Sequence, residues 1–416
     1  MRIVMAVTND LVTDRRVLRH AEALREGGYE VECVGKRELG VRARRGWMFY
    51  AECNVRLLLW LLRRRMEIVW ANDTDTLMGC YVATRVKNLC LRLRGAKGER
   101  VRLVMDAHEL FPEVPELIGR ERVKRVWEWI EKRMMPKCDA RLTVCQSIAD
   151  YYRKRYGVEM TVVRNVGKWK TESGKRKTES GKWGEDANVN VNANFCGRGR
   201  PRSQGGVESG KWKTESGKWK VESGEWKTES GKWMLLYQGA VNKGRGVDWA
   251  IDALEWLEDC ELVVAGGGDL LEEMKDYAAG KPWAERIRFL GRLMPEELER
   301  LTAKASVGLV MLEDMGLSYH FALPNRIGDF VAAGVPMVVS DLPEMSRVVR
   351  EYGVGEVIEE PRDERYETRV KGLAEAVERV LAREWTEADF EAARRDMDWE
   401  KEKRKLMEMV DKMRND

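Results

Sequence analysis

The 416-residue sequence lacks the long apolar runs that cross membranes, since no stretch reaches about 18 consecutive apolar residues. Its opening, MRIVMAVTND, leads straight into strand-like residues, so we expect no cleaved secretion signal. The eight cysteines include no CxxC pair and have no regular spacing. This pattern argues against a disulfide framework or a zinc site and favours reduced, buried thiols in a cytoplasmic chain.

The sequence is also poor in histidine and in net charge. Its three histidines are His20, His108 and His320. The net charge of +4 is small beside 74 basic and 70 acidic residues, which argues against a nucleic-acid-binding protein. The hydrophobic content of 44% is enough to build cores, and the length predicts two or three domains.

What the sequence does contain is a seven-residue repeat within residues 167–233, whose last copies read KWKTESGKWKVESGEWKTESGKW. A coiled coil needs two apolar positions per heptad and no interior glycine, whereas each unit here has one Trp and one Gly. Lys and Trp could bind single-stranded nucleic acid, but the Glu of each unit cancels much of that charge. We therefore interpret residues 167–233 as a low-complexity, disordered linker, whose length costs little stability at a loop.

Predicted strands and helices alternate on both sides of this repeat. Apolar, β-branched runs such as RIVMAV and RVRLVMDAHEL are separated by segments with helical spacing in residues 1–166, and residues 234–383 repeat the style. Residues 384–416 form a charged helical segment. The alternation predicts an α/β fold with two Rossmann-like, doubly wound parallel sheets facing a cleft, where ligands bind beyond the carboxyl ends of the strands.

Polar and glycine-rich segments follow the predicted strands of the second half. GAVNKGRG offers Lys243, Arg245 and a helix start, which together can bind a diphosphate, although a basic surface turn explains them equally well. AGGGD lacks the GxGxxG spacing of dinucleotide sites. We interpret its glycines, Gly267 among them, as letting the backbone approach a ligand, with a tight turn as an equal alternative.

The segment LPNRIGDF is the sharpest signal in the second half. Pro324 presets the first turn of a helix, and we expect Asn325 and Arg326 to face the same anion site as Arg245. Asp329 lies one turn later on the same helix face, where a carboxylate can accept both hydroxyls of a ribose. The alternative is an ordinary capped helix with Asp in its first turn.

In the first half, ANDTDTL contains Asp73 and Asp75, which look like a metal-binding DxD pair. We expect them instead to cap the following helix or to shape its turn. His108, in DAHEL, follows a predicted strand and is either a polar contact in the cleft or a satisfied structural histidine. His20 lies within a predicted helix and is interpreted as structural.

Taken together, the sequence resembles the GT-B glycosyltransferases, within the retaining type known as family 4 or group 1. The matching segments occur in the family's order in both halves and exclude only the repeat: DRRVLRHAEALREGGYEV, ANDTDTL, MDAHELFPE, TVCQSIADYYRKRYG, LLYQGAVNKGRGVDWAIDAL, RIRFLGRLMPEELERL and ALPNRIGDFVAAGVPMVVSD. The resemblance implies a nucleotide-sugar donor bound by residues 234–383 and an acceptor bound by residues 1–166. It also implies transfer with retention, no metal, no cofactor, and a C-terminal helix that crosses back to the first domain.

The resemblance further implies roles for single residues. The Gly239 turn would lie beside the donor diphosphate. Of the family's usual basic pair, only Arg245 keeps its charge, because Ala240 occupies the other position. Lys243 or Arg326 would then supply the second cation.

Two more family positions bear on the donor sugar. The paired glutamates of the family correspond to Phe321 and Asp329, so Asp329 keeps the ribose role and Phe321 cannot make the polar sugar contact. His108 corresponds to a histidine that contacts the donor sugar at the reacting centre. The full expectation is: catalytic His108 and Arg245; donor-binding Gly239, Lys243, Arg245, Gly267, Asn325, Arg326 and Asp329; acceptor-side Asp14, Arg15 and Glu109.

Two basic, amphipathic stretches of the first half, RLLLWLLRRRM and RERVKRVWEWIEKRMMPK, suit an anionic membrane surface, or else pack on their own sheet with solvated basic faces. The predicted function is retaining sugar transfer to a glycan or polyisoprenyl-linked acceptor in cell-surface polysaccharide or glycolipid synthesis. The expected location is the cytoplasm, including the inner face of the cell membrane. The alternatives are a nucleotide-sugar epimerase of the same architecture and an inactive nucleotide-sugar or glycan-binding protein.

Overall fold

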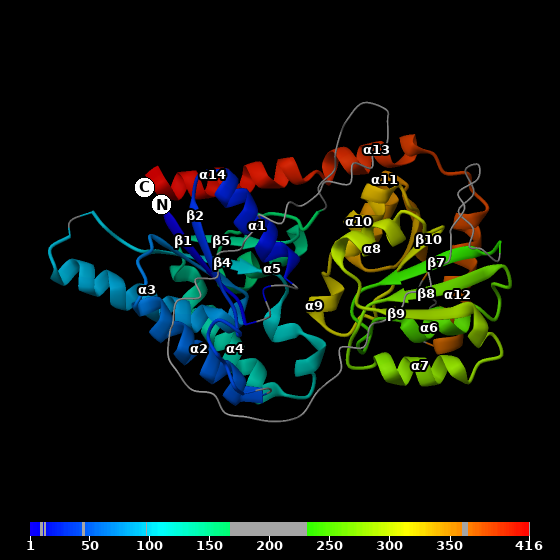
Figure 1. Cartoon of the computed structure of the whole chain (residues 1–416), viewed down its shortest axis with the longest axis horizontal. Helices are drawn as coiled ribbons and strands as arrows, with labels where there is room; N and C mark the ends of the chain where they lie inside the picture. The colour runs from blue at the N-terminus through cyan, green and yellow to red at the C-terminus, as the bar shows by residue number, and fades with distance from the viewer. Residues whose placement is uncertain are drawn as a thin grey trace, which may run out of the picture. The chain divides into compact units, whose positions relative to one another are not determined.

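The structure is a computed structural model that describes residues 1–8, 11, 14–43, 46–96, 98–166, 231–359 and 365–415. These residues form two six-stranded, all-parallel sheets with helices packed on them (Figure 1). Most of the repeat, residues 167–230, lies outside the described residues, so its interpretation as a disordered linker stays a prediction. The predicted fold class, two Rossmann-like α/β sheets, is confirmed.

The first sheet has the strand order β2-β1-β3-β4-β5-β6. Its strands are β1 (Arg2–Ala6), β2 (Glu30–Val34), β3 (Ile68–Asn72), β4 (Arg102–Ala107), β5 (Ala140–Thr143) and β6 (Thr161–Val162). The helices between them are α1 (Arg15–Glu26), α2 (Gly46–Leu62), α3 (Thr74–Leu93), α4 (Glu121–Met134) and α5 (Gln146–Tyr156), with the short turns η2 (Phe111–Glu113), η3 (Pro115–Leu117) and η4 (Met135–Lys137). Strand β3 is buried along its whole length, as expected of a central parallel strand covered on both faces.

The second sheet has the order β12-β11-β10-β7-β8-β9. Its strands are β7 (Trp233–Gln238), β8 (Cys260–Ala265), β9 (Ile287–Gly291), β10 (Val307–Val310), β11 (Met337–Ser340) and β12 (Gly355–Ile358). The helices are α6 (Val247–Ala253), α7 (Leu271–Ala279), α8 (Pro295–Thr302), α9 (Leu317–His320), α10 (Asn325–Ala333), α11 (Pro343–Tyr352) and α12 (Tyr366–Leu381), with the short turn η5 (Ala284–Arg286).

Both sheets have a point where the strand order reverses. It falls between β1 and β3 in the first sheet and between β7 and β10 in the second. Ligands of such sheets bind beyond the carboxyl ends of the strands at this reversal. The ends of β1, β3, β7 and β10 are therefore where a site is expected.

The C-terminal helices α13 (Glu387–Asp396) and α14 (Trp399–Asn415) follow the second sheet, and α14 packs against α1 of the first half (Figure 1). The Arg164 backbone N–H and Nε donate to the Glu402 carboxylate at 3.0 and 2.9 Å. Trp399 stacks on His20, with ring centroids 5.9 Å apart. His20 is thus a packed core residue, and burial lowers its pKa to about 4. None of the described helices is long and apolar enough to cross a bilayer.

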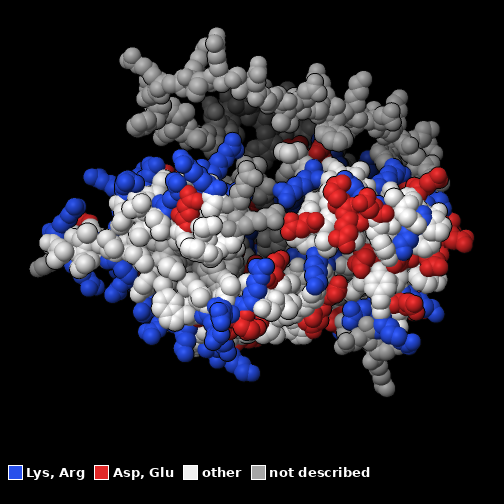
Figure 2. Space-filling view, turned by 90° about the horizontal axis from the view of Figure 1, so that it is seen from below, with Lys and Arg blue, Asp and Glu red and all other residues white. Residues whose placement is uncertain are grey.

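The two halves differ sharply in charge. Residues 1–166 contain 33 Lys and Arg against 22 Asp and Glu, a net charge of +11. Residues 234–416 contain 26 against 39, a net charge of −13. Figure 2 shows this division on one face, with Lys and Arg prominent over the first half and Asp and Glu gathered over the second.

Candidate active site

A glycine turn follows β7 at the strand reversal of the second sheet. Gly239 has a φ of 135°, a conformation that L side chains rarely adopt, and its N–H donates to the Ala265 carbonyl at 3.0 Å. A Cβ on Gly266 would lie 1.7 Å from the Gly239 carbonyl oxygen. Gly266 therefore allows the ends of β7 and β8 to touch. A Cβ on Gly267 would lie 3.0 Å from the Arg292 Nε, so the glycines after β8 have an intramolecular packing role.

Arg245 lies in the turn between β7 and α6. Its guanidinium is 4.8 Å from the centre of the Tyr319 ring. Its Nε is buried and has no hydrogen-bond partner among the described residues. Lys243, two residues earlier, is exposed. Because α6 has only seven residues, the case for an anion site here rests on these two side chains.

Arg326 differs from the sequence-based expectation that it faces an anion beside Arg245. Its side chain is buried, with Nη1 donating to the Gln238 carbonyl at 3.0 Å and Nη2 to the Met311 carbonyl at 3.3 Å. The guanidinium also lies 4.8 Å from the centre of the Tyr237 ring. Arg326 therefore ties the ends of β7 and β10 together beneath the Gly239 turn. The helical spacing predicted its position but not that its donors are used inside the sheet.

Asp329 lies one turn into α10, which begins at the exposed Asn325 with Pro324 as its N-cap. Its carboxylate accepts a hydrogen bond from the Gln238 Nε2 at 3.0 Å. It also lies 3.7 Å from the Arg15 guanidinium of the first half. Burial raises the pKa of Asp329, and the neighbouring arginines oppose that shift. The structure thus brings one predicted donor residue and one predicted acceptor-side residue into contact.

His108 follows β4 and lies between two carboxylates. Its backbone N–H donates to Asp73 Oδ1 at 2.7 Å, and its ring Nδ1 lies 3.2 Å from Asp73 Oδ2. Its Nε2 lies 3.6 Å from Asp106 Oδ2. Burial disfavours the charged ring, but Asp73 and Asp106 more than offset it, so the pKa of His108 is well above its usual value. The raised pKa favours the charged form of the ring, whose side chain is 18% exposed.

Asp106 lies beneath His108 and is fully buried. The Arg16 guanidinium pairs with its Oδ1 at 2.7 Å. Burial alone would raise the pKa of Asp106, but Arg16 and the neighbouring histidines hold it well below its usual value. The network therefore links α1, β4 and the segment after β3.

Asp73 was expected to cap the following helix or to shape its turn, and its side chain makes a further contact. It occupies the N-cap position of α3, but its side chain makes no capping hydrogen bond and instead holds His108. Its φ of 63° and ψ of 165° lie in a region that is almost confined to glycine, and among the described residues it alone, apart from glycines, has a positive φ. Such strain costs about 1–3 kcal/mol and concentrates at functional sites. Sequence reasoning missed this role, although Asp73 ends a strand adjacent to β4.

The remaining predicted residues of the first half have distinct surroundings. Burial, reinforced by Asp73 and Glu116, raises the pKa of Glu109 to about 7, and the Arg245 charge opposes that shift. Glu109 is thus within electrostatic reach of Arg245 of the second half. Asp14 accepts the Val17 N–H at 3.1 Å and caps α1.

Asp75, the second carboxylate of the DxD look-alike, hydrogen-bonds to the Thr8 hydroxyl. Burial and the nearby Asp73 raise its pKa to about 8. Within the parts of the chain that the structure describes, no cluster of three or more His, Cys, Asp or Glu could hold a metal ion.

Comparisons with known proteins identify the family of both halves. Residues 13–166 match the family model "Glycosyltransferase Family 4", and residues 232–383 match "Glycosyl transferases group 1". A stretch of 130 residues is 31% identical to a phosphatidyl-myo-inositol mannosyltransferase of Mycobacterium leprae, covering 30% of this chain and 32% of that protein. The chain therefore spans about a third of the length of this relative.

Solved structures share the fold over nearly the whole chain. A sucrose-phosphate synthase from Thermosynechococcus elongatus superposes with a TM-score of 0.64 at 14% identity, covering 99% of both chains. A UDP-forming trehalose-phosphate synthase from Burkholderia xenovorans superposes with a TM-score of 0.56 at 15% identity, covering 98% of both chains. With both halves matched by their family models, in the same order along the sequence, the chain belongs to the family 4 and group 1 glycosyltransferases, which have the GT-B fold.

Proposed function

We propose that this glycosyltransferase moves a sugar from a nucleotide-diphosphate sugar to a glycan or lipid-linked acceptor, with retention and without a metal ion. Residues 234–383 would bind the donor, and residues 1–166 the acceptor. The observation that carries the proposal is Arg245: a guanidinium in the loop between β7 and α6, with a buried Nε that lacks a partner within the described part of the chain. An anionic diphosphate supplies the acceptor oxygen that this N–H needs.

The donor would occupy the carboxyl edge of the second sheet. Arg245 and the exposed Lys243 would neutralise charge that grows on the leaving diphosphate, which is where electrostatic stabilisation has the largest effect on rate. Asp329 would accept the ribose hydroxyls. Its present neighbours, Gln238 at 3.0 Å and Arg15 at 3.7 Å, hold the carboxylate in place, and the Arg15 charge opposes the rise in its pKa that burial causes.

His108 would act from the facing edge of the first sheet. Held by Asp73 and Asp106, the imidazolium cannot swing away, and it fixes the backbone that leads into Glu109. Its positive charge would complement the donor phosphates. The acceptor hydroxyl would attack on the face that the leaving group departs from, beside Arg15 and Glu109, while the closed site excludes water.

A lipid-linked acceptor is supported by the surface of the first half. Its net charge of +11 favours an anionic membrane, whereas the −13 of the second half opposes one. Exposed apolar side chains line α2 and α4, including Val55, Leu59, Val126 and Trp129. The mannosyltransferase relative is named for a phosphatidyl-inositol acceptor. These features support a peripheral position at the inner face of the cell membrane.

The test is an incubation with UDP-, GDP- and ADP-sugars, with and without polyisoprenyl-phosphate or glycolipid acceptors and with and without EDTA. Proton NMR of the product reports the anomeric configuration. The proposal expects acceptor-dependent nucleotide release, an unchanged anomeric configuration and no effect of EDTA. An inverted product or full inhibition by EDTA would overturn the mechanism. Sugar interconversion without transfer would favour an epimerase, and tight nucleotide binding without turnover an inactive binding protein.

A further inference from the structure

A hollow lies beside the first sheet, at the opposite end of the strands from His108. It has a volume of about 400 Å³ and is lined by α3, the start of β4 and the segment from η4 to β5. Val101 and Leu103, at the amino end of β4, form part of its wall, whereas His108 follows the carboxyl end of the same strand. A six-residue strand spans about 20 Å, so the hollow is separate from the proposed donor site.

Cations dominate the lining of this hollow. Arg85, Arg92 and Lys137 line it and have no carboxylate partner among the described residues. A fourth cation, Arg100, is neutralised by Asp139 at 3.1 Å. Glu99 is the remaining acid of the lining. It does not balance the other cations, so the hollow keeps an excess of positive charge. Gathering like charges in one concavity is unfavourable unless an anion relieves the repulsion.

The walls of the hollow are held in place by hydrogen bonds between its elements. The Asn88 side chain bonds to both backbone groups of Val101, accepting from the N–H at 2.7 Å and donating to the carbonyl at 2.9 Å. Asp139 accepts the Leu103 N–H at 2.8 Å. These contacts join α3, β4 and the start of β5 under the cations. The hollow is therefore formed before any ligand binds.

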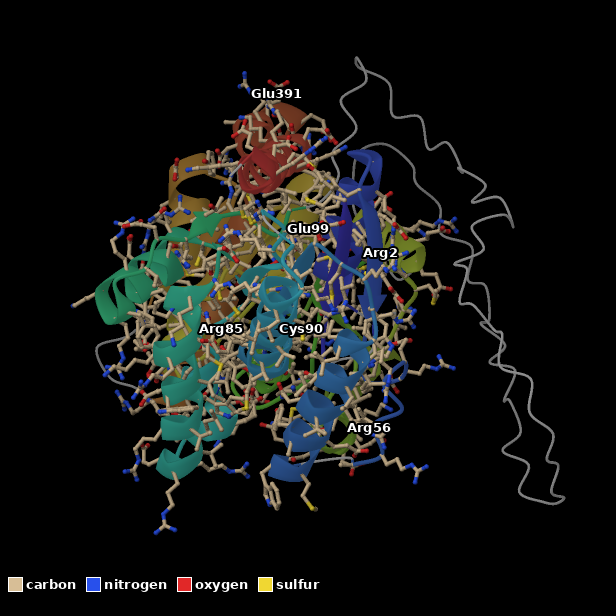
Figure 3. The ribbon with its side chains drawn as sticks, turned by 90° about the vertical axis from the view of Figure 1, so that its left-hand side faces the viewer. Arg2, Arg56, Arg85, Cys90, Glu99 and Glu391 are labelled. Carbon is tan, nitrogen blue, oxygen red and sulfur yellow. The ribbon has the colours of Figure 1, made fainter. Side chains whose placement is uncertain are left out.

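One lip of the hollow is apolar. Val86 and Leu89 line it from α3, and Leu89 is 57% exposed. Leu93, one turn further along α3, is also exposed. Figure 3 faces this side of the molecule, with Arg85 on α3 and Glu99 on the segment before β4. A ligand for this hollow would thus combine an anionic head with an apolar or neutral body.

We propose that this hollow binds a phosphate ester, with the guanidiniums of Arg85 and Arg92 and the ammonium of Lys137 around the phosphate oxygens. Arginine forks pair with phosphate in bidentate fashion, and the planar guanidinium favours this geometry over a point charge. The ester group lies against Val86 and Leu89. The same chemistry occurs in a soluble phosphoester and in the head group of an anionic phospholipid.

The experiment separates these two sources on the full-length chain. Isothermal titration with sn-glycerol 3-phosphate measures the soluble arm, and co-sedimentation with phosphatidylcholine vesicles, with and without phosphatidic acid, measures the lipid arm. The test variant is Arg85→Gln/Arg92→Gln. Its matched control is Arg37→Gln/Arg42→Gln, which removes the same charge from two exposed arginines of the same half outside the hollow.

The proposal expects wild type and control to bind at least one phosphate source, and the test variant to bind it roughly tenfold more weakly or not at all. Binding of glycerol phosphate assigns a soluble ligand, and binding confined to phosphatidic-acid vesicles assigns a lipid. Absence of binding in both arms, or an equal loss in the control, overturns the site. Thermal unfolding checks that the variant folds. Lys137→Gln is a second, independent variant of the hollow and should also weaken phosphate binding. UDP binding should be unchanged in all variants, which separates this site from the proposed donor site.

Discussion

The two halves of the chain share one architecture but build the polar edges of their sheets differently. In the first half, His108 is held by carboxylates from two neighbouring strand ends, Asp73 after β3 and Asp106 within β4. In the second half, short contiguous segments supply the edge: the Gly239 turn with Arg245, and α10 with Asp329. Local segments can be recognised in a sequence, whereas a network across strands depends on the strand order.

Two arginines of the second half have contrasting surroundings. The Arg326 guanidinium donates hydrogen bonds to backbone carbonyls, whereas the buried Nε of Arg245 has no partner among the described residues. One cation stabilises the sheet, and the other is available to a ligand. Substitutions at these two positions therefore test whether Arg326 contributes to stability and Arg245 to turnover.

The largest expected effect is on turnover in Arg245→Ala. Removing a preorganised charge from the leaving diphosphate should lower kcat by about 10²–10³, or roughly 3–4 kcal/mol, because such donors act mainly in the transition state. Steady-state kinetics with the best donor measures it. The control is Arg300→Ala, which removes an exposed arginine from α8 in the same half and should leave kcat unchanged. Equal kinetics for both variants would remove Arg245 from the site.

Arg326→Met should lower the free energy of unfolding. The substitution leaves the carbonyls of Gln238 and Met311 without their donor inside the sheet, which costs about 3 kcal/mol. Urea denaturation gives the free energy of unfolding, and Arg245→Met is the matched control with an expected change within about 0.5 kcal/mol. If Arg245→Met unfolds as easily as Arg326→Met, the proposed division between the two arginines is wrong.

Much of this arrangement could be predicted from the sequence, and the exceptions share a physical cause. Alternating apolar runs encode the two sheets, and the segments around Gly239 and Asp329 lie in short stretches. The link between Asp73 and His108 joins residues 35 positions apart, because β3 and β4 are neighbours in the sheet. Helical spacing placed Arg326 beside Asp329, but spacing alone cannot show which polar side chain turns toward the backbone.

Asp73→Asn tests the network across strands. The asparagine has the same shape and can still accept the His108 N–H, so the loop should keep its position. The ring loses its charged partner, its pKa falls, and kcat should drop by about 10–100-fold, as for other residues that orient a functional side chain. The imidazolium is lost as pH rises through its pKa, so the alkaline limb of the kcat profile should move to lower pH in the variant. Asp75→Asn removes a carboxylate that is more weakly coupled to the ring and should move this limb less.

The free energy of unfolding of the first half should also depend on pH. Burial raises the pKa of Asp75 to about 8, from the 3.8 of an ordinary aspartate, so the folded chain retains a proton that the unfolded chain releases above about pH 4. Stability should therefore fall as pH rises from about 4 to 8, by at most about 1.4 kcal/mol per pH unit from this group.

Asp75→Asn has no proton to release, so its free energy of unfolding relative to wild type should rise steadily between pH 5 and pH 8. Glu131, which burial raises to a pKa of about 7, and His20, with a pKa lowered to about 4, also titrate in this range, and both are present in variant and wild type. The difference between the two urea-denaturation curves isolates Asp75. A difference that stays constant with pH would mean that Asp75 is ionised in the folded chain, as a buried carboxylate stabilised by the Thr8 hydroxyl.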